Sequence, residues 1–244
     1  MFGLAAMAAV VTLAGVVTTQ VAPASAATCT PTGFIRDGID LTAAKINPAG
    51  TVSGTVDATG CNIGIYYSAS TGNVDNANVF GANYYGIVVN SDLANVSVNV
   101  SNSNVHNIGE TPANGAQHGV AIYYHDEGPF SVGGVVSNNL VSAYQKGGIV
   151  ATGGSISVLG NTVTGLGSVD FIAQNGIQIG FGASAEIHGN SVSGNDYTPK
   201  SYVSCGILYY GAAGVKASQN TMRDNEMNFC NFGEKGGGQY NPNP

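Results

Sequence analysis

Residues 148–163 read GIVATGGSISVLGNTV, and this stretch contains both short motifs that recur along the chain. The first motif is a glycine followed by an apolar residue, here Gly148-Ile149. The second is an asparagine followed closely by an apolar residue, here Asn161-Thr162-Val163. Between them, Ile156-Ser157-Val158 alternates apolar and polar side chains. Alternating runs bounded by Gly, Asn or Ser are typical of short β-strands separated by tight bends.

Both motifs return at intervals of one repeat. The glycine motif occurs at Gly64-Ile65, Gly86-Ile87, Gly119-Val120, Gly148-Ile149, Gly176-Ile177 and Gly206-Ile207, with gaps of 22, 33, 29, 28 and 30 residues. The asparagine motif occurs at Asn78-Val79, Asn104-Val105, Asn139-Leu140-Val141, Asn161-Thr162-Val163, Asn190-Ser191-Val192 and Asn220-Thr221-Met222. A period in this range indicates a stacked array in which no repeat buries its own apolar face.

The alternation within each repeat predicts which side chains face inward. In Gly176-Ile177-Gln178-Ile179 the two isoleucines point to one face and the glutamine to the other. Each strand is expected to pair with its counterpart one coil later, about 4.8 Å away. Asparagine tolerates the left-handed backbone of a bend and is able to bond to the asparagines above and below it. We therefore expect a structural asparagine ladder.

These residues resemble the right-handed parallel β-helix repeat family, which shares its fold with pectate lyases. The likeness is carried by Gly-Ile-x-Val strands and Asn-x-Val turns, as in residues 156–163, and it covers about residues 50–230. It implies an all-β fold, a single-stranded right-handed parallel β-helix of roughly 6–8 coils. The family contains lyases, hydrolases and C5-epimerases of uronic-acid polymers, and members without known catalysis.

The two ends of the chain differ from the repeats. Residues 1–26 are predicted to be a secretory signal peptide, because Phe2–Val17 is apolar and Ala24-Ser25-Ala26 suits cleavage. This implies a secreted, extracellular protein with no membrane span in its mature chain. We expect the β-helix domain over residues 27–232 and a disordered tail over 233–244. The segment Thr42–Lys45 has some helical character and is expected to cap the first coil.

Four cysteines lie in the predicted mature chain, and an even count in an exported chain suggests disulfides. Three pairings are possible. We favour Cys29–Cys61 and Cys205–Cys230, because each of these pairs would clamp one end of a stacked array.

The charge of the chain limits its partners. It has 7 Lys and Arg against 14 Asp and Glu, a net charge of -7. Nucleic-acid binding needs clusters of Lys and Arg, so that function is excluded. We expect a monomer whose partner is a polysaccharide or cell-surface glycan.

The candidate catalytic residues are His125, Asp126, Glu127 and Lys146. The first three directly follow Tyr123 and Tyr124, and these five residues form the densest ionisable cluster of a charge-poor chain. The cluster comes directly after a long interruption of the repeat at residues 110–118, and function in repeat proteins often lies on such loops. Tyr123, Tyr124 and Asp170 are candidate substrate-binding residues. We expect stacking to bring these side chains onto one face.

Two kinds of chemistry suit this cluster. Cleaving or epimerising a uronic acid needs a group that neutralises the carboxylate and a base for the C5 proton. His125 or Tyr124 would be base or acid, Asp126 and Glu127 would hold a Ca²⁺, and Lys146 would assist. Alternatively, Asp126 and Asp170 would form the acid and base of a glycoside hydrolase. Pectate lyases use an arginine as base, whereas the arginines here, Arg36 and Arg223, lie near the two ends.

A non-catalytic interpretation stands beside these hypotheses. Residues 123–127 would then form a solvated loop, and the stacked coils would be an extracellular structural or adhesion module. Tyrosine doublets bear on binding in either case, because sugar rings stack on exposed aromatic faces. In each doublet one ring is expected to pack inward and the other to lie on the surface. The doublets are Tyr66-Tyr67, Tyr84-Tyr85, Tyr123-Tyr124 and Tyr209-Tyr210.

Overall fold

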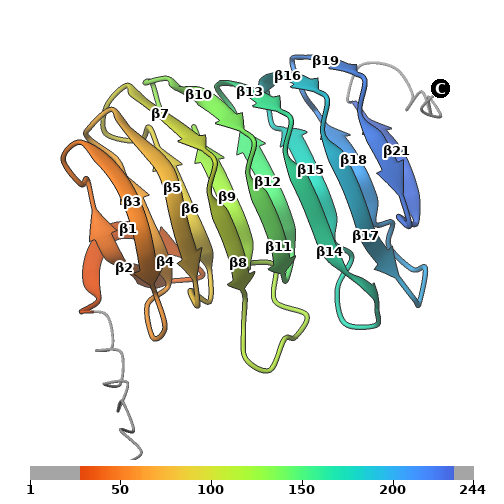
Figure 1. Ribbon diagram of the computed structural model, residues 1–244, viewed down its shortest axis with the longest axis horizontal. Helices are drawn as coiled ribbons and strands as arrows, with labels where there is room; N and C mark the ends of the chain where they lie inside the picture. Colours follow the sequence, from red (N-terminus) through yellow and green to blue (C-terminus); the bar gives the residue numbers. More distant parts are fainter. Residues whose placement is uncertain (1–27, 234–244) are drawn as a thin grey trace, which may run out of the picture.

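The computed structural model describes residues 28–233, and all helical or strand elements found in that range are β-strands, with no helix among them (Figure 1). The described residues accordingly contain no helix long and apolar enough to cross a membrane. The expected signal peptide, residues 1–26, lies outside the described residues, as does the expected tail apart from Gly233. The strands form two sheets that lie against each other around an apolar interior.

The first sheet has nine strands in the order β1-β2-β4-β6-β9-β12-β15-β18-β21. Their bounds are β1 Thr30–Arg36, β2 Ile39–Ile46, β4 Ile63–Tyr67, β6 Tyr85–Asn90, β9 Val120–His125, β12 Gly147–Thr152, β15 Asn175–Gly180, β18 Cys205–Tyr210 and β21 Met227–Phe232. All neighbours pair in parallel except β1 and β2, which form an antiparallel hairpin.

The second sheet has twelve strands in the order β19-β16-β13-β10-β7-β5-β8-β11-β14-β17-β20, and β3 pairs with β5. Their bounds are β3 Thr51–Asp57, β5 Gly72–Phe80, β7 Val96–Ser101, β8 Asn104–Ile108, β10 Val132–Ser137, β11 Leu140–Tyr144, β13 Ser155–Leu159, β14 Thr162–Val169, β16 Ser184–His188, β17 Ser191–Tyr197, β19 Gly214–Ser218 and β20 Thr221–Arg223. The long strand β5 joins two ladders, because β7 pairs with its first half and β8 with its second.

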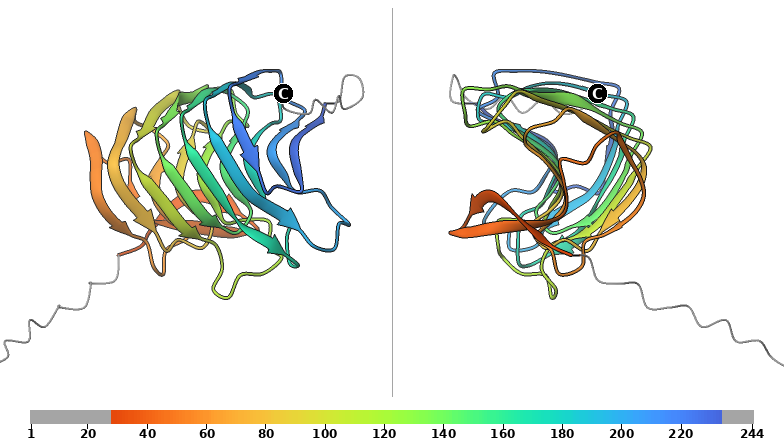
Figure 2. Two further views of the ribbon diagram at one scale, coloured as in Figure 1. Left: turned by 45° about the vertical axis from the view of Figure 1, so that its right-hand side comes forward. Right: turned by 90° about the vertical axis from the view of Figure 1, so that its left-hand side faces the viewer.

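The chain passes repeatedly from the nine-stranded sheet through the twelve-stranded sheet and back. Successive passes begin at β2, β4, β6, β9, β12, β15 and β18, and β21 starts one more. Viewed along the stack, the passes lie one behind another, and the β1–β2 hairpin lies across one side of them (Figure 2). Residues one pass apart are therefore neighbours, as the repeats predict.

The interior consists of rows of equivalent apolar side chains. The row on the nine-stranded sheet is fully buried and contains Ile65, Ile87, Ile122, Ile149, Ile177 and Ile207. Burying each isoleucine contributes about 1.5–3 kcal/mol. The glycine that precedes each of these isoleucines except Ile122 lets the sheets approach, since a Cβ at Gly86 would lie 2.5 Å from the Ala121 carbonyl oxygen and 2.7 Å from Val105 Cγ1.

The sequence-based prediction for one repeat of the glycine motif, Gly119-Val120, is wrong. Ile87 pairs in register with Ile122, so Ala121-Ile122 takes the place expected for Gly119-Val120. Gly119 instead belongs to the end of the segment between β8 and β9 and has a φ of +86°. A two-residue offset inside a long connection cannot be detected from spacing alone.

The asparagine ladder is confirmed for four of its six expected members. These four are Asn139, Asn161, Asn190 and Asn220. In each of the last three, the side-chain oxygen accepts hydrogen bonds from the backbone N–H and the side-chain NH₂ of the preceding asparagine, at 2.9–3.0 Å. These side chains are almost fully buried. Each one is the second residue of a two-residue bend whose first residue, 138, 160, 189 or 219, has a positive φ.

Asn78 and Asn104 are not part of this ladder. They lie one position later, opposite each other and in line with Leu140, and their side chains point outward. The Asn104 side-chain NH₂ donates to the Asn78 side-chain oxygen at 3.0 Å. The ladder position in these two passes is occupied by Ala77, within the continuous strand β5, and by Ser103, the second residue of the bend between β7 and β8.

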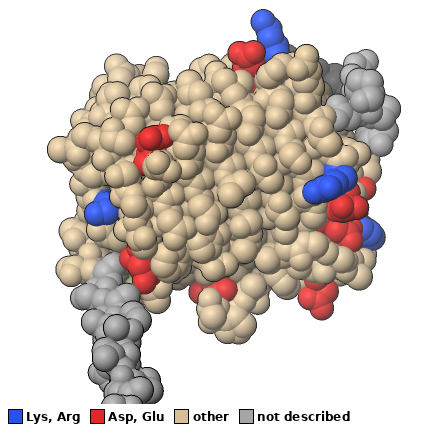
Figure 3. Space-filling model, viewed as in Figure 1, with Lys and Arg blue, Asp and Glu red and all other residues tan. Residues whose placement is uncertain are grey.

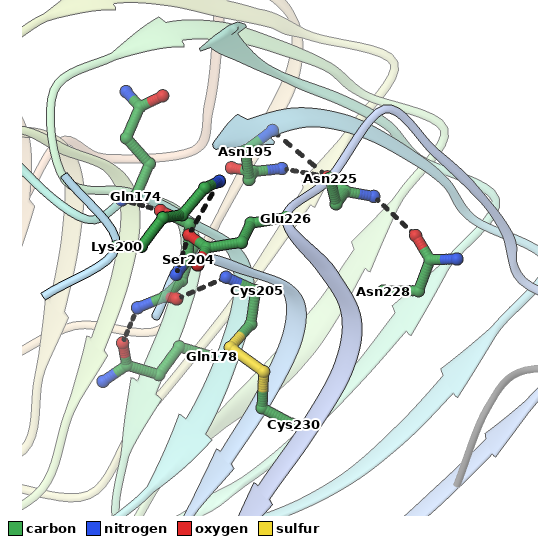
Figure 4. Close-up of a disulfide and its surroundings, with 11 residues drawn as sticks. Gln174, Gln178, Asn195, Lys200, Ser204, Cys205, Asn225, Glu226, Asn228 and Cys230 are labelled. Carbon is green, nitrogen blue, oxygen red and sulfur yellow. Dashed lines mark hydrogen bonds and ion pairs between the residues drawn. A yellow bond between two sulfur atoms is a disulfide. The ribbon is translucent and has the colours of Figure 1, made fainter. Parts of the chain in front are cut away.

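Both favoured disulfide pairings are confirmed. Cys29 bonds to Cys61 next to β1, and Cys205 of β18 bonds to Cys230 of the last strand, β21 (Figure 4). The helical cap expected at Thr42–Lys45 is wrong. These residues belong to strand β2, because they pair with β1 on one side and β4 on the other and alternate in burial.

Candidate functional site

The structure separates the predicted site residues into two groups on the outer face of the nine-stranded sheet. Tyr123 and His125 end β9, whereas Lys146 comes just before β12. Because His125 pairs with Thr152, Lys146 lies six residues away along the neighbouring strand. At about 3.3 Å per residue, the Cα atoms of His125 and Lys146 are about 20 Å apart. They do not converge on one sugar.

Strand β1 brings an arginine to the first group. Arg36 Nη2 lies 3.0 Å from His125 Nδ1 and 3.3 Å from the Tyr123 hydroxyl, although it is almost ninety positions away in the sequence. The same nitrogen lies 3.7 Å from Glu127 Oε1. The Phe34 ring stacks beneath the guanidinium, with its centroid 4.8 Å from Arg36 Cζ.

His125 lies at the centre of this group and is only 2% exposed. The Tyr123 hydroxyl lies 3.0 Å from His125 Nδ1 and 3.0 Å from Thr152 Oγ1. Burial, followed by the Arg36 guanidinium, lowers the pKa of His125, while Asp92 acts in the opposite direction from 3.5 Å. Burial raises the pKa of Tyr123. The group therefore holds a neutral imidazole and a neutral phenol beneath β1.

The two carboxylates after His125 are more open. Asp126 is half-buried, and its backbone N–H donates to the Thr152 carbonyl at 2.8 Å. The side chain of Glu127 is 63% exposed. Among residues 28–233, no three His, Cys, Asp or Glu side chains come together as a metal site. The described carboxylates therefore give no support to the Ca²⁺ expected at Asp126 and Glu127.

Three of the four tyrosine doublets alternate as expected, whereas Tyr84 and Tyr85 both face outward, and most of the outer rings are covered. Tyr67, Tyr124 and Tyr209 belong to the interior core. Tyr124 is fully buried and its hydroxyl donates to the Val98 carbonyl at 2.6 Å, so it does not contact a ligand at the surface. Tyr66, Tyr84, Tyr85 and Tyr123 face outward beneath the hairpin and are also buried. Tyr210, at 51%, is the exposed member of the doublets.

A groove of about 870 Å³ opens on the same face, over the later strands. Asn175 and Gln178 of β15 and Leu208 of β18 line it from the sheet. Five connections contribute lining residues, those between β8 and β9, β11 and β12, β14 and β15, β15 and β16, and β17 and β18. Its lining residues are Gly115, Gln117, Lys146, Phe171, Ile172, Ala173, Asn175, Gln178, Phe181, Tyr197, Tyr202, Val203, Leu208, Tyr210 and Phe232.

Aromatic rings dominate the groove. Phe181, Tyr210 and Phe232 follow or end adjacent strands, and they are 62%, 51% and 49% exposed. The Phe181 and Tyr210 ring centroids are 5.4 Å apart. Tyr202, the most exposed ring, lies on the connection before β18. The faces of these rings are open to solvent and together form an exposed apolar surface. Contiguous exposed surfaces of this kind are unusual in folded domains.

Lys146 is the charged residue of this lining. Its ammonium Nζ donates to the Ala173 carbonyl at 2.9 Å, and burial lowers the pKa of Lys146. Asp170 is exposed just before the wall residue Phe171 and is not part of the lining. The groove thus combines aromatic faces, three side-chain amides and a single cation, without a carboxylate or imidazole.

The sequence missed most of this groove. Phe171 and Tyr202 lie on connections that carry no repeat signal, and Tyr197 is the last residue of β17. Phe232 was detectable in principle, because it pairs with Tyr210 at the ends of equivalent strands, and Phe181 comes one residue after Gly180, the partner of Tyr210 on β15. Elsewhere charge is sparse, and the face shown in Figure 3 carries charged side chains mostly near its margins.

No protein-family model, curated protein or solved structure matches this chain.

Proposed function

We propose that this protein is a secreted right-handed parallel β-helix protein that binds an extracellular polysaccharide of the uronic-acid type in the aromatic groove. The parallel pairing of each strand with its counterpart one pass later supports a β-helix. Right-handedness is supported by the general rule that about 98% of crossovers between parallel strands of one sheet are right-handed. The resemblance of the repeats to the pectate-lyase-like family points the same way.

Secretion is supported by two independent features. Residues 1–26 have the apolar run and small-residue site of a signal peptide. The four cysteines form two disulfides, which persist mainly in oxidising compartments outside the cytosol.

The observation that carries the binding proposal is the exposed row of Phe181, Tyr210 and Phe232 beside polar amides. Apolar faces of sugar rings pack on aromatic rings, and their hydroxyls need hydrogen-bond partners such as Asn175 and Gln178. Lys146 adds a partly desolvated cation that suits the carboxylate of a uronic acid. The groove crosses several strands, as a polymer site requires.

Binding without cleavage is favoured over hydrolysis. A glycoside hydrolase needs two carboxyl groups on either side of the scissile bond, and the groove lining contains none. Asp126 follows the far end of β9, whereas Asp170 precedes β15 at the opposite edge of the sheet. These positions do not support the acid and base pair expected from the sequence. A non-catalytic adhesion module of this kind would use the same groove.

A lyase or epimerase is the second candidate, favoured by the contact of Arg36 with His125 and Tyr123. An arginine beside a neutral imidazole and a phenol supplies a cation for a carboxylate and groups able to move a proton. The 2% exposure of His125 argues against direct access of a polymer.

The binding proposal is tested by titrating purified protein with polygalacturonate and with a neutral glucan. Tyr210→Ala and Phe232→Ala should each weaken binding to polygalacturonate, with Phe130→Ala as control for an exposed aromatic outside the groove. Lys146→Gln should weaken it about tenfold, as expected for loss of a hydrogen bond from a charged group. Lys216→Gln on β19 is the matched control. Equal affinities for the wild type and all five variants would contradict the groove as the site.

Catalysis is tested separately on the same polymers. A lyase produces an unsaturated sugar with ultraviolet absorbance, and an epimerase changes the stereochemistry at C5. If either product forms and His125→Gln abolishes it without loss of folding, the second candidate replaces the first. Absence of both products at saturating protein supports binding alone.

A further inference from the structure

The outer face of the nine-stranded sheet is open at one end and covered at the other. Over β15, β18 and β21 it forms the aromatic groove. Over β4, β6 and β9 it is covered by β1, whose Phe34 ring lies 5.9 Å from Tyr66, 6.2 Å from Tyr85 and 5.2 Å from the His125 ring. One strand thus reaches across three others.

The covered part continues the floor of the groove. Parallel pairing places Tyr66, Val88, Tyr123, Val150, Gln178 and Leu208 in one register row along the sheet. The last two line the groove, and the first four belong to the cluster beneath the hairpin. Tyr85 lies next to this row, with its ring stacked on Tyr123 at 5.1 Å. Without β1, the aromatic surface would extend across the sheet.

Strand β1 is anchored to β2 by backbone pairing and by hydrogen bonds from Thr32 to the Leu41 carbonyl and from the Gly33 N–H to Asp40, but few of its side chains contact the strands that it covers. It pairs with β2 alone, and its register is interrupted between Pro31 and Ile35. Phe34 is its one fully buried side chain. Cys29 ties its start to Cys61, so the strand remains attached if it lifts. Its far end is held by Arg36, through His125, Tyr123 and Glu127.

We propose that β1 is a movable strap over a second binding strip, formed by Tyr66, Tyr85 and Tyr123, which extends the groove for longer chains of the same acidic glycan. This inference rests on the proposed function of the groove. Short oligomers would occupy the open groove alone, and longer ones would displace the strap. The Arg36 guanidinium released in this way would be free to pair with a second sugar carboxylate.

The strap itself is tested without any glycan by nitrating tyrosines with tetranitromethane and locating the products by mass spectrometry. Arg36→Gln should raise nitration of Tyr85 and Tyr123 at least fivefold, while the exposed Tyr202 and Tyr210 react equally in all variants. Arg223→Gln on β20 is the control for loss of an arginine. Unchanged protection of Tyr85 and Tyr123 in Arg36→Gln would overturn the strap.

A second pair of variants locks the strap. Ile35 and Asp40 are directly paired across the hairpin, a geometry that accepts a disulfide. Oxidised Ile35→Cys/Asp40→Cys should keep Tyr85 and Tyr123 protected, and Ile35→Ser/Asp40→Ser is its matched control. For galacturonic-acid oligomers, the locked protein should bind long chains at least fivefold more weakly than the serine control and short chains equally.

Equal affinity of the locked and serine proteins for long chains would refute the extended strip, even if the strap moves. If neither protein binds any oligomer, the groove function fails, and nitration still decides whether β1 opens. The two failures are therefore distinguishable.

Discussion

Substitution of Asn161 tests whether the asparagine ladder stabilises the fold. The Asn161 side chain makes four hydrogen bonds of 2.9–3.0 Å, donating to the Val136 carbonyl and the Asn190 side chain and accepting twice from Asn139. It is 1% exposed. At about 1 kcal/mol net for each bond, Asn161→Ala should lower the free energy of unfolding by about 4 kcal/mol. That is a large part of the ~5–15 kcal/mol typical of a domain.

The matched control is Asn104→Ala. Asn104 also belongs to a pair of stacked asparagines, but it is half-exposed and donates one side-chain hydrogen bond, to Asn78. Its removal should cost about 1 kcal/mol or less. Urea unfolding followed by circular dichroism measures both values, and equal slopes in urea would indicate that the unfolded states are comparable. If Asn161→Ala costs no more than Asn104→Ala, burial of the ladder does not stabilise this fold as argued.

Two further predictions concern stability. Gly176→Ala should lower the free energy of unfolding by about 1–3 kcal/mol, because the new Cβ would lie 2.4 Å from Val192 Cγ1 and 2.6 Å from the Gly206 carbonyl oxygen. The control is Gly214→Ala, which should be neutral because its Cβ meets nothing closer than 3.9 Å. Equal urea midpoints for the two variants would contradict the close approach of the sheets. Lowering the pH below about 6.5 should destabilise the wild type through His125, since its folded pKa is lowered and the unfolded chain then binds the additional proton. His125→Gln should flatten this part of the pH profile of unfolding, and an unchanged slope would mean that His125 does not titrate as argued.

The stacked strands could be predicted because their signal is repeated in every pass. Each interior row needs an apolar side chain at the same place, so Ile149 and Ile177 report the same constraint twice. The ladder gave a similar signal, and its one error was the inclusion of Asn78 and Asn104, which lie one position after the ladder residues Ala77 and Ser103. An asparagine one position away from the ladder recurs at the same spacing as the ladder itself, so spacing alone does not distinguish the two.

The candidate site could not be predicted in the same way, because it depends on segments that occur once. Nothing in the spacing of Arg36 and His125 indicates that an antiparallel hairpin folds back over β9. The aromatic wall at Tyr202 likewise depends on the path of one connection, the one between β17 and β18. The alternation along β9 indicates that Tyr123 and Tyr124 point to opposite faces of the sheet, but it does not indicate what covers the outer ring, Tyr123.

The position of the groove follows from where this fold tolerates insertions. The bends within the twelve-stranded sheet, such as residues 160–161 between β13 and β14, have two residues, and the second is buried in the ladder. An inserted residue there would break hydrogen bonds in two neighbouring passes. The connections that return to the nine-stranded sheet vary most in length, from residues 145–146 to residues 109–119, whereas those that leave it vary from residues 153–154 to residues 126–131. Length variation is therefore greatest at one edge of the nine-stranded sheet, and that edge is one wall of the groove. New walls can arise at this edge without disturbing the rows that hold the stack together, so a binding surface can change there while the interior stays the same.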